Sequence, residues 1–150
     1  MIKLNLPTFD IKLRGTKEHP MIFDILRKKF IALTPEEWVR QHFIHYLTEH
    51  KNYPAALMGS EISLNINGMA RRCDCVLFGP DNLPRMILEF KSPSVRISQA
   101  VFSQICAYNQ AMHVRYLIVS NGLRHFCCLV DYEHRKYDFL PEIPCYEELS

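Results

Sequence analysis

Three acidic residues and one lysine stand at spacings that could bring them into one site: Glu61, Asp74, Glu89 and Lys91. The segments that carry them are predicted as strands, at residues 61–66, 70–78 and 85–91. Opposed carboxylates on neighbouring strands lie about 5 Å apart and repel by about 3 kcal/mol at an effective dielectric constant of about 20. An exposed ion pair with the lysine stabilises by only about 0–1 kcal/mol. A divalent cation would offset the remainder, and Mg²⁺ suits a site with few protein ligands.

The turns between these strands decide whether the acids share a face. Asn67-Gly68 is the favoured two-residue hairpin turn, and it places Glu61 directly opposite Asp74. Side chains on one face of a strand recur at every second residue. The first two acids are therefore expected on one face of the sheet.

The second connection is longer and contains both Gly and Pro. A turn centred on Asp81 and Asn82 would pair Phe78 with Arg85, and this register also brings Asp74 opposite the acid of the third strand. The alternative is a bulge that slips one register by a residue and sends one acid to the other face. Apolar residues on both faces of these strands indicate a sheet covered on both sides, where acids are costly and point to function.

Two amphipathic helices are expected beside the sheet. Thr34 is the predicted N-cap of the first, with Pro35 as its first residue and Glu37 as the acid of a capping box, and the pattern ends near His50. Its inward apolar positions are Val39, Phe43, Tyr46 and Leu47. The second helix covers residues 98–112. Its inward positions are Val101, Ile105, Tyr108 and Met112.

Further strands complete the expected fold: a pair within residues 1–31, and single strands at 115–120 and 123–130. The strand, helix, strand order implies a crossover to a parallel neighbour. The predicted class is α/β (α+β), a mixed central sheet flanked by helices in the order αβββαβ with extra N-terminal strands. No repeat or linker divides the chain, so we expect one domain over residues 1–150, with an extension at 1–31 and a core at 32–146.

Composition narrows the function classes. The formal net charge of +2 is too small to mark a nucleic-acid binder by charge alone. The six cysteines lack the paired C-x-x-C spacing of zinc sites, and His42 with His45 have no evident partners, so zinc is not expected. Neither a signal peptide nor an apolar run of membrane-spanning length is present, which predicts a cytoplasmic protein with free thiols and no membrane partner.

The acidic motif resembles that of a nuclease superfamily. Asp74, a hairpin and then Glu89-Phe90-Lys91 resemble the signature of the PD-(D/E)xK nucleases, although Cys73 replaces the proline of that motif. Gln104 to Tyr108 is similar to the Q-x-x-x-Y motif of their restriction and recombination branches. The resemblance implies a restriction-endonuclease-like core.

A closer likeness involves two other segments. Leu33 to Gln41 and Tyr116 to Gly122 resemble bacterial proteins similar to the N-terminal domain of type I restriction enzyme R subunits, and the likeness runs from about Leu33 to Tyr146. The G-x-x-x-x-G-K-[ST] loop of the translocating motor is absent, so this chain is not expected to bind a nucleoside triphosphate. The implied partners are DNA and either a second copy of the chain or restriction-system subunits.

The resemblance implies a Mg²⁺- or Mn²⁺-dependent endonuclease that hydrolyses DNA phosphodiesters. Asp74, Glu89 and the carbonyl group of Phe90 would hold the metal, and Lys91 would orient the attacking water and stabilise developing charge. Glu61 is either a further ligand or a surface acid at a strand end. Gln104 and Tyr108 either position Lys91 or a phosphate, or form a buried polar pair. Four arginines either contact the DNA backbone or are simply solvated: Arg71, Arg72, Arg96 and Arg124.

Two other function classes remain open. The domain could be a non-catalytic DNA-binding or assembly module that keeps the nuclease fold, although such a module has no need of the acids. It could also be a metal-stabilised structural domain without a nucleic-acid partner, which the small net charge allows.

Overall fold

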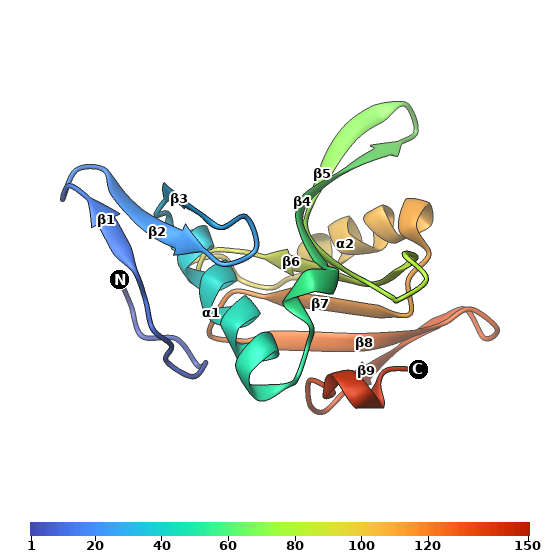
Figure 1. Cartoon of the computed structure of the whole chain (residues 1–150). Helices are drawn as coiled ribbons and strands as arrows, with labels where there is room; N and C mark the ends of the chain where they lie inside the picture. The colour runs from blue at the N-terminus through green and yellow to red at the C-terminus, as the bar shows by residue number, and fades with distance from the viewer.

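The computed structural model describes all of residues 1–150 and contains two sheets, two α-helices and two short 3₁₀ helices (Figure 1). The N-terminal sheet has the order β1-β2-β3: β1 (Leu13–Gly15), β2 (Pro20–Asp24) and β3 (Lys29–Ala32). The central sheet runs from β4 to β9 in chain order: β4 (Met58–Ile66), β5 (Met69–Phe78), β6 (Pro84–Phe90), β7 (Tyr116–Ser120), β8 (His125–Asp131) and β9 (Lys136–Leu140). The helices are α1 (Pro35–His50), η1 (Ala55–Leu57), α2 (Gln99–Met112) and η2 (Tyr146–Glu148).

The two α-helices cover opposite faces of the central sheet. Phe43 of α1 packs in one buried cluster with Leu88 of β6, whereas Ile105 and Tyr108 of α2 pack in a second cluster with Ile87. Successive residues of β6 thus face different helices, as expected for a strand buried on both sides. β6 and β7 are parallel, and the other neighbouring strands of this sheet are antiparallel. The predicted α+β class, with a mixed sheet and the order αβββαβ, is confirmed.

Helix α1 begins as its sequence predicts, with one difference. The Thr34 hydroxyl accepts a hydrogen bond from the backbone N–H of Glu37 (3.0 Å), and Pro35 occupies the first turn. The carboxylate of Glu37 does not close the expected capping box. It turns along the helix and accepts from the Gln41 side-chain amide (2.9 Å), because buried cations and amides lie on that side of α1.

The first hairpin keeps the predicted register, since Ile66 pairs with Met69 across the Asn67-Gly68 turn. The second keeps it only in part. Residues 75–77 pair with β6 in the predicted register, but Phe78 pairs with Pro84 and not with Arg85. The predicted turn at this end was therefore wrong.

The physical reason lies in the loop after β5. The N–H of Gly79 donates to the carbonyl oxygen of Leu83 (2.8 Å), and Asn82 adopts a left-handed conformation (φ 65°). The Gly79–Leu83 hydrogen bond closes a turn that is longer than the expected two-residue turn. Arg85 is left without a pairing partner on β5, which produces the irregularity in pairing beside Phe78. The slip lies at the loop end of the hairpin, away from the acids.

The sequence also underestimated the number of strands. The N-terminal segment forms three strands where two were expected, because a turn with Lys28 in a left-handed conformation returns the chain as β3. β9 was missed entirely. It is an edge strand, and Tyr137 and Phe139 are exposed on it, so it lacks the buried alternation by which strands are recognised.

The chain's first residues belong to the folded core. Leu4 is buried in the α1 cluster, and the N–H of Asn5 donates to the carbonyl oxygen of Gly122 (2.8 Å) in the turn between β7 and β8. The N-terminal segment therefore reaches the sheet edge where the carboxyl ends of β6 and β7 meet.

No helix is long and apolar enough to cross a membrane.

Replacing Gly122 by alanine should report on this docking. Gly122 has φ +86°, and a Cβ atom there would lie 2.8 Å from Leu4 Cδ2 and 3.1 Å from Val39 Cγ2. We expect Gly122→Ala to lower the free energy of unfolding by about 2–3 kcal/mol in urea denaturation, from backbone strain plus overpacking. Gly68→Ala is the control, because Gly68 has φ +78° but no atom within 4 Å of its Cβ position, and should cost only about 1 kcal/mol. Equal losses would show that the contact with Leu4 contributes nothing.

Candidate functional site

The central sheet opens at the point where two of the predicted acids meet. The regular pairing of β5 with β6 ends at Cys75 and Leu88. Asp74 and Glu89 are the next residues of the two antiparallel strands, just beyond the last pair. Beyond it, Asp74 Oδ2 accepts from the Phe90 N–H (2.8 Å), and Glu89 Oε2 accepts from the Asp74 N–H (3.4 Å). Each carboxylate thus takes the place of a backbone acceptor across the opening. Both acids are buried.

Glu61 lies where the β4–β5 hairpin changes direction. The strands pair in the same register on both sides of Glu61, at Ser60↔Cys75 and at Ile62↔Cys73, so Glu61 is not a bulge with an extra residue. Glu61 itself has φ 56°, a left-handed conformation uncommon for this residue type. Cys73 packs in the α2 cluster, whereas Cys75 packs in the α1 cluster. The hairpin therefore twists at Glu61 and rises from the sheet (Figure 1).

The positive charge next to these acids comes from a residue that the sequence did not single out. The side chain of Arg40 is 5 % exposed. Its Nη2 donates to Glu61 Oε1 (2.6 Å) and lies 3.9 Å from Asp74 Oδ1, and its Nη1 donates to Ser60 Oγ (2.7 Å) and to the Asp74 carbonyl oxygen (3.4 Å). A guanidinium presents several donors in a planar fork, which suits one cation among several acceptors. The repulsion predicted for the acids is offset within the protein.

The position of Arg40 could have been noticed in the sequence. It lies three and four residues before the buried Phe43 and Ile44, and hence on the inward face of α1. An arginine on that face needs acidic partners, since buried charges are paired. Because the acids by themselves suggest a metal, Arg40 was not among the predicted site residues.

A chain of alternating charges runs from Arg40 to the N-terminal sheet. Arg40 Nε lies 3.4 Å from Glu37 Oε2, and Arg27 Nη2 lies 3.6 Å from Glu37 Oε1. Arg27 Nε donates to Asp24 Oδ2 (2.5 Å), and Asp24 is fully buried. The candidate site is thus joined electrostatically to β2.

Lys91 follows β6 and connects the acids to helix α2. Its Nζ lies 3.9 Å from Glu89 Oε1 and donates to Gln104 Oε1 (2.9 Å). The Gln104 amide donates in turn to the Tyr108 hydroxyl (3.1 Å). The structure therefore brings Gln104 and Tyr108 to Lys91, on the flank of α2 that their four-residue spacing predicts.

A further acid, Glu36 in the first turn of α1, borders the site without having been predicted. Although Glu36 is exposed, partial desolvation raises the pKa of its carboxyl group, and the nearby Asp74 carboxylate adds to the effect while Lys91 opposes it. Glu36, Glu37, Arg40 and Ser92 line a hollow of about 350 Å³ beside the acids. No sequence motif distinguished Glu36 from the capping acid next to it.

The four arginines expected to contact DNA occupy two separate places. Arg71 and Arg72 are exposed on the hairpin beyond its twist, and Arg72 Nη1 lies 3.5 Å from Glu61 Oε2. Arg96 and Arg124 are exposed in the loops that follow β6 and β7. These loops are joined by a hydrogen bond from the Asn121 amide to the Val95 carbonyl oxygen (2.8 Å). All four arginines are exposed, but the structure does not gather them into one patch.

Comparison with known proteins assigns the family. A model described as the type I restriction enzyme R protein N terminus (HSDR_N) matches residues 35–144. The chain belongs to this family. The match covers α1 and the whole central sheet, including Asp74, Glu89 and Lys91. No curated protein matches the chain.

A solved structure of this R-subunit type shares the fold. It is a fragment of a putative HsdR subunit of a type I restriction enzyme from Vibrio vulnificus, with a TM-score of 0.58 and 19% sequence identity. The match covers 79% of this chain and 25% of that chain. This HSDR_N domain therefore spans about a quarter of the length of the fragment it resembles.

The electrostatics of the HSDR_N acids differ from one to the next. Burial and the neighbouring Asp74 carboxylate raise the pKa of Glu89 to about 8. Burial also raises the pKa of Asp74, although the Phe90 N–H and Arg40 act against it. At Glu61, burial acts in the same direction, but the hydrogen bond and charge of Arg40 outweigh it and lower the pKa. At neutral pH the buried pair therefore retains a proton, whereas Glu61 is ionised.

The acids meet the requirements of a divalent cation only in part. No group of three His, Cys, Asp or Glu side chains lies close enough together to hold a metal ion. Asp74 Oδ1 and Glu89 Oε1, however, have no hydrogen-bond partner, only cations 3.9 Å away. The Phe90 carbonyl is on the same strand edge as its N–H and so faces the opening. Two carboxylates and a carbonyl fit Mg²⁺, which keeps several waters, and fit poorly to a cation that needs an all-protein cage.

Replacing Arg40 tests whether the acids depend on it. Arg40→Met leaves three carboxylates without their buried cation, and we expect it to lower the free energy of unfolding at neutral pH by about 3 kcal/mol in urea denaturation. The matched control is Arg72→Met, because Arg72 contacts the same Glu61 but its side chain is 69% exposed. It should cost less than about 1 kcal/mol. A loss for Arg40→Met no larger than that of the control would contradict the role assigned to Arg40.

Glu89→Gln should remove a pH dependence of stability from the metal-free protein. The pKa of Glu89 is about 8 in the fold against an ordinary value of 4.5, so the native state binds more protons between these values. Its stabilising contribution is present below pH 4.5 and is lost as the pH rises to about 8. We expect the wild-type melting temperature to fall by about 3 °C or more beyond that of Glu89→Gln between about pH 5 and 8. Parallel declines in the two proteins would exclude a raised pKa at Glu89.

Proposed function

We propose that this domain is a metal-dependent DNA endonuclease of the PD-(D/E)xK superfamily that hydrolyses phosphodiester bonds. The observation that carries the proposal is the opening between β5 and β6, where two buried carboxylates face each other beside a lysine. Each carboxylate is fixed by a backbone N–H and keeps one oxygen free. Membership of the HSDR_N family supports the same reading.

Asp74, Glu89 and the carbonyl group of Phe90 would hold Mg²⁺ or Mn²⁺. When bound, the metal would supply Lewis-acid stabilisation of the phosphate and a water of lowered pKa. The free oxygens of the two carboxylates set the place of binding, and the hydrogen bonds to their other oxygens fix the orientation of each ligand. Because the metal-free pair retains a proton, binding should be tighter at higher pH.

The remaining residues would orient groups and move charge. Lys91 would hold the attacking water and stabilise negative charge on the phosphate, since a compact ammonium can reach both. Gln104 holds the Lys91 ammonium through its oxygen, and Tyr108 holds the Gln104 amide. This relay fixes Lys91 beside Glu89 while leaving it 20% exposed to the substrate. Gln104 and Tyr108 are thus positioning residues.

Glu61 is better suited to holding Arg40 than to binding a metal. One oxygen accepts from Arg40 and the other lies near Arg72. Glu36 has no hydrogen-bonded guanidinium partner and lines the hollow beside the acids, so it is the stronger candidate for an additional contact to the metal, made through a water molecule. Arg96 and Arg124 would contact the DNA backbone near the site, and Arg71 and Arg72 would do so from the hairpin. Larger restriction assemblies would supply the partner subunits.

A second function is favoured by one observation. Because Arg40 already offsets the acids, the fold does not require a metal, and the domain could serve as a non-catalytic DNA-binding or assembly module. Such a module would bind DNA equally with and without Mg²⁺. The two functions therefore differ in their response to the metal.

Asp74→Asn and Lys91→Ala should separate these functions. Asp74→Asn removes a metal ligand and a like charge, so we expect cleavage to be lost, metal-free stability to be unchanged or raised, and the Mg²⁺-induced melting shift to shrink. Lys91→Ala should abolish cleavage, keep most of that shift, and lower metal-free stability by removing a cation that offsets the negative charge of the Asp74–Glu89 pair. Thermal melts with and without Mg²⁺, beside a plasmid-nicking assay, measure these effects. Equal Mg²⁺ shifts in wild type and Asp74→Asn would support the non-catalytic module.

A further inference from the structure

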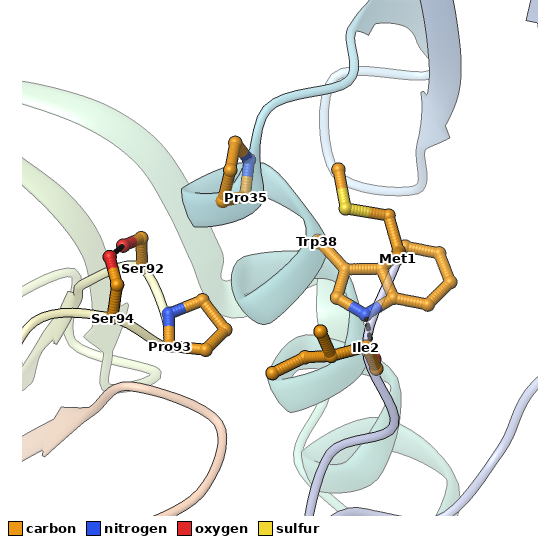
Figure 2. A pocket seen from close by; sticks show the side chains of 7 residues that line it. All are labelled: Met1, Ile2, Pro35, Trp38, Ser92, Pro93 and Ser94. Atoms are coloured by element: carbon orange, nitrogen blue, oxygen red, sulfur yellow. Dashed lines mark hydrogen bonds between the residues drawn. The ribbon is translucent and has the colours of Figure 1, made fainter.

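A pocket of about 340 Å³ lies next to the candidate site (Figure 2). The Trp38 pocket is lined by Met1, Ile2, Pro35, Trp38, Ser92, Pro93 and Ser94. Figure 2 shows the loop residues Ser92, Pro93 and Ser94 on one side and Trp38 with Met1 and Ile2 on the other. Its volume is at the small end of the range of about 300–1,000 Å³ for small-molecule sites. One planar ring system fits, and an extended ligand does not.

The Trp38 pocket adjoins the hollow beside the candidate site, with which it shares two lining residues. Pro35 directly precedes Glu36, and Ser92 directly follows Lys91. Pro35 and Ser92 also line the 350 Å³ hollow that contains Glu36 and Arg40. A group in the pocket would therefore lie close to a phosphate at Lys91, as a base lies close to its own backbone.

The chemistry of the walls favours a neutral planar ring. The Trp38 indole is held in place because its Nε1 donates to the Ile2 carbonyl oxygen (2.8 Å) and its ring meets His42 edge-on, with centroids 4.4 Å apart. Ser92 and Ser94 share a hydrogen bond (2.8 Å) and can both donate to and accept from a ligand. No charged side chain lines the pocket. Stacking on an aromatic ring is tolerant of base identity.

We propose that the Trp38 pocket takes one unpaired base of the DNA strand whose phosphate lies at Lys91. The proposal rests on the endonuclease function and specifies its substrate: DNA with an unpaired nucleotide next to the cleaved bond. Extracting a base from a duplex costs least where the base is already unpaired. The pocket would therefore select mismatched, bulged or single-stranded positions over fully paired duplex.

Trp38 provides the readout, because it is the only tryptophan of the chain. The experiment titrates Asp74→Asn protein in metal-free buffer, where cleavage is not expected, with three short duplexes. One has a single extrahelical thymidine, one has an abasic sugar at that position, and one is fully paired. We expect the thymidine duplex to quench Trp38 fluorescence and to bind about 10-fold more tightly than the abasic duplex.

Ser94→Phe fills the pocket without altering an acid or Lys91. In the Asp74→Asn background it should abolish the preference for the thymidine duplex and leave the affinity for the abasic duplex unchanged. Ser103→Phe is the matched control, since Ser103 is exposed on α2 outside the pocket, and it should keep the preference. Circular dichroism would establish that both variants fold.

Three results would overturn the proposal: equal binding of the three duplexes, no binding of any, or a preference that survives Ser94→Phe. A nicking assay of the wild type with Mg²⁺, run in parallel, tests the endonuclease function separately. Cleavage without base preference would leave the nuclease standing and remove the pocket. Quenching and preference without cleavage would keep the pocket as a base-binding site and remove the nuclease.

Discussion

The guanidinium group of Arg40 lies between α1 and the β4–β5 hairpin, and the arrangement of the site follows from it. Three carboxylates of different chain segments surround this one buried cation, and a serine hydroxyl and a backbone carbonyl accept hydrogen bonds from its Nη1. An isolated buried carboxylate would be too costly to retain. The charge of Arg40 offsets the mutual repulsion and the desolvation cost of these carboxylates. Arg40 belongs to α1, which also packs against the apolar core. Hairpin twist, helix position and acid placement are thereby coupled.

The break in the central sheet has a related origin. Continued pairing of β5 with β6 would satisfy backbone groups with one another and leave Asp74 and Glu89 as two opposed charges. The strands separate, and the carboxylates accept from the backbone N–H groups of Phe90 and Asp74. Backbone donors are satisfied, as buried donors must be. Each acid supports the fold with one carboxylate oxygen and leaves the other oxygen without a hydrogen-bond partner.

Local patterns predicted the parts of this structure that depend on local interactions. The Asn67-Gly68 turn set the first register, and Thr34 with Pro35 set the start of α1. The four-residue spacing of Gln104 and Tyr108 placed both on one flank of α2.

Features that depend on distant partners were not predictable in this way. Arg40 becomes notable only when Glu61 and Asp74 are known to face it. The twist at Glu61 could not be predicted from the sequence, because glutamate seldom adopts a positive φ. The loop after β5 was misjudged because its closing hydrogen bond joins residues on either side of the expected turn.

The charge chain from Asp24 through Arg27 to Glu37 bears on where this domain begins as a folding unit. The family match starts at residue 35, which would make the first strands look like an appendage. Cutting the chain there would deprive Glu37 of Arg27 and strip Leu4 from the core. The boundary recognised by sequence similarity therefore cuts through contacts that α1 makes with the preceding residues. A fragment designed on the former would lack the outer half of the electrostatic network that supports Arg40.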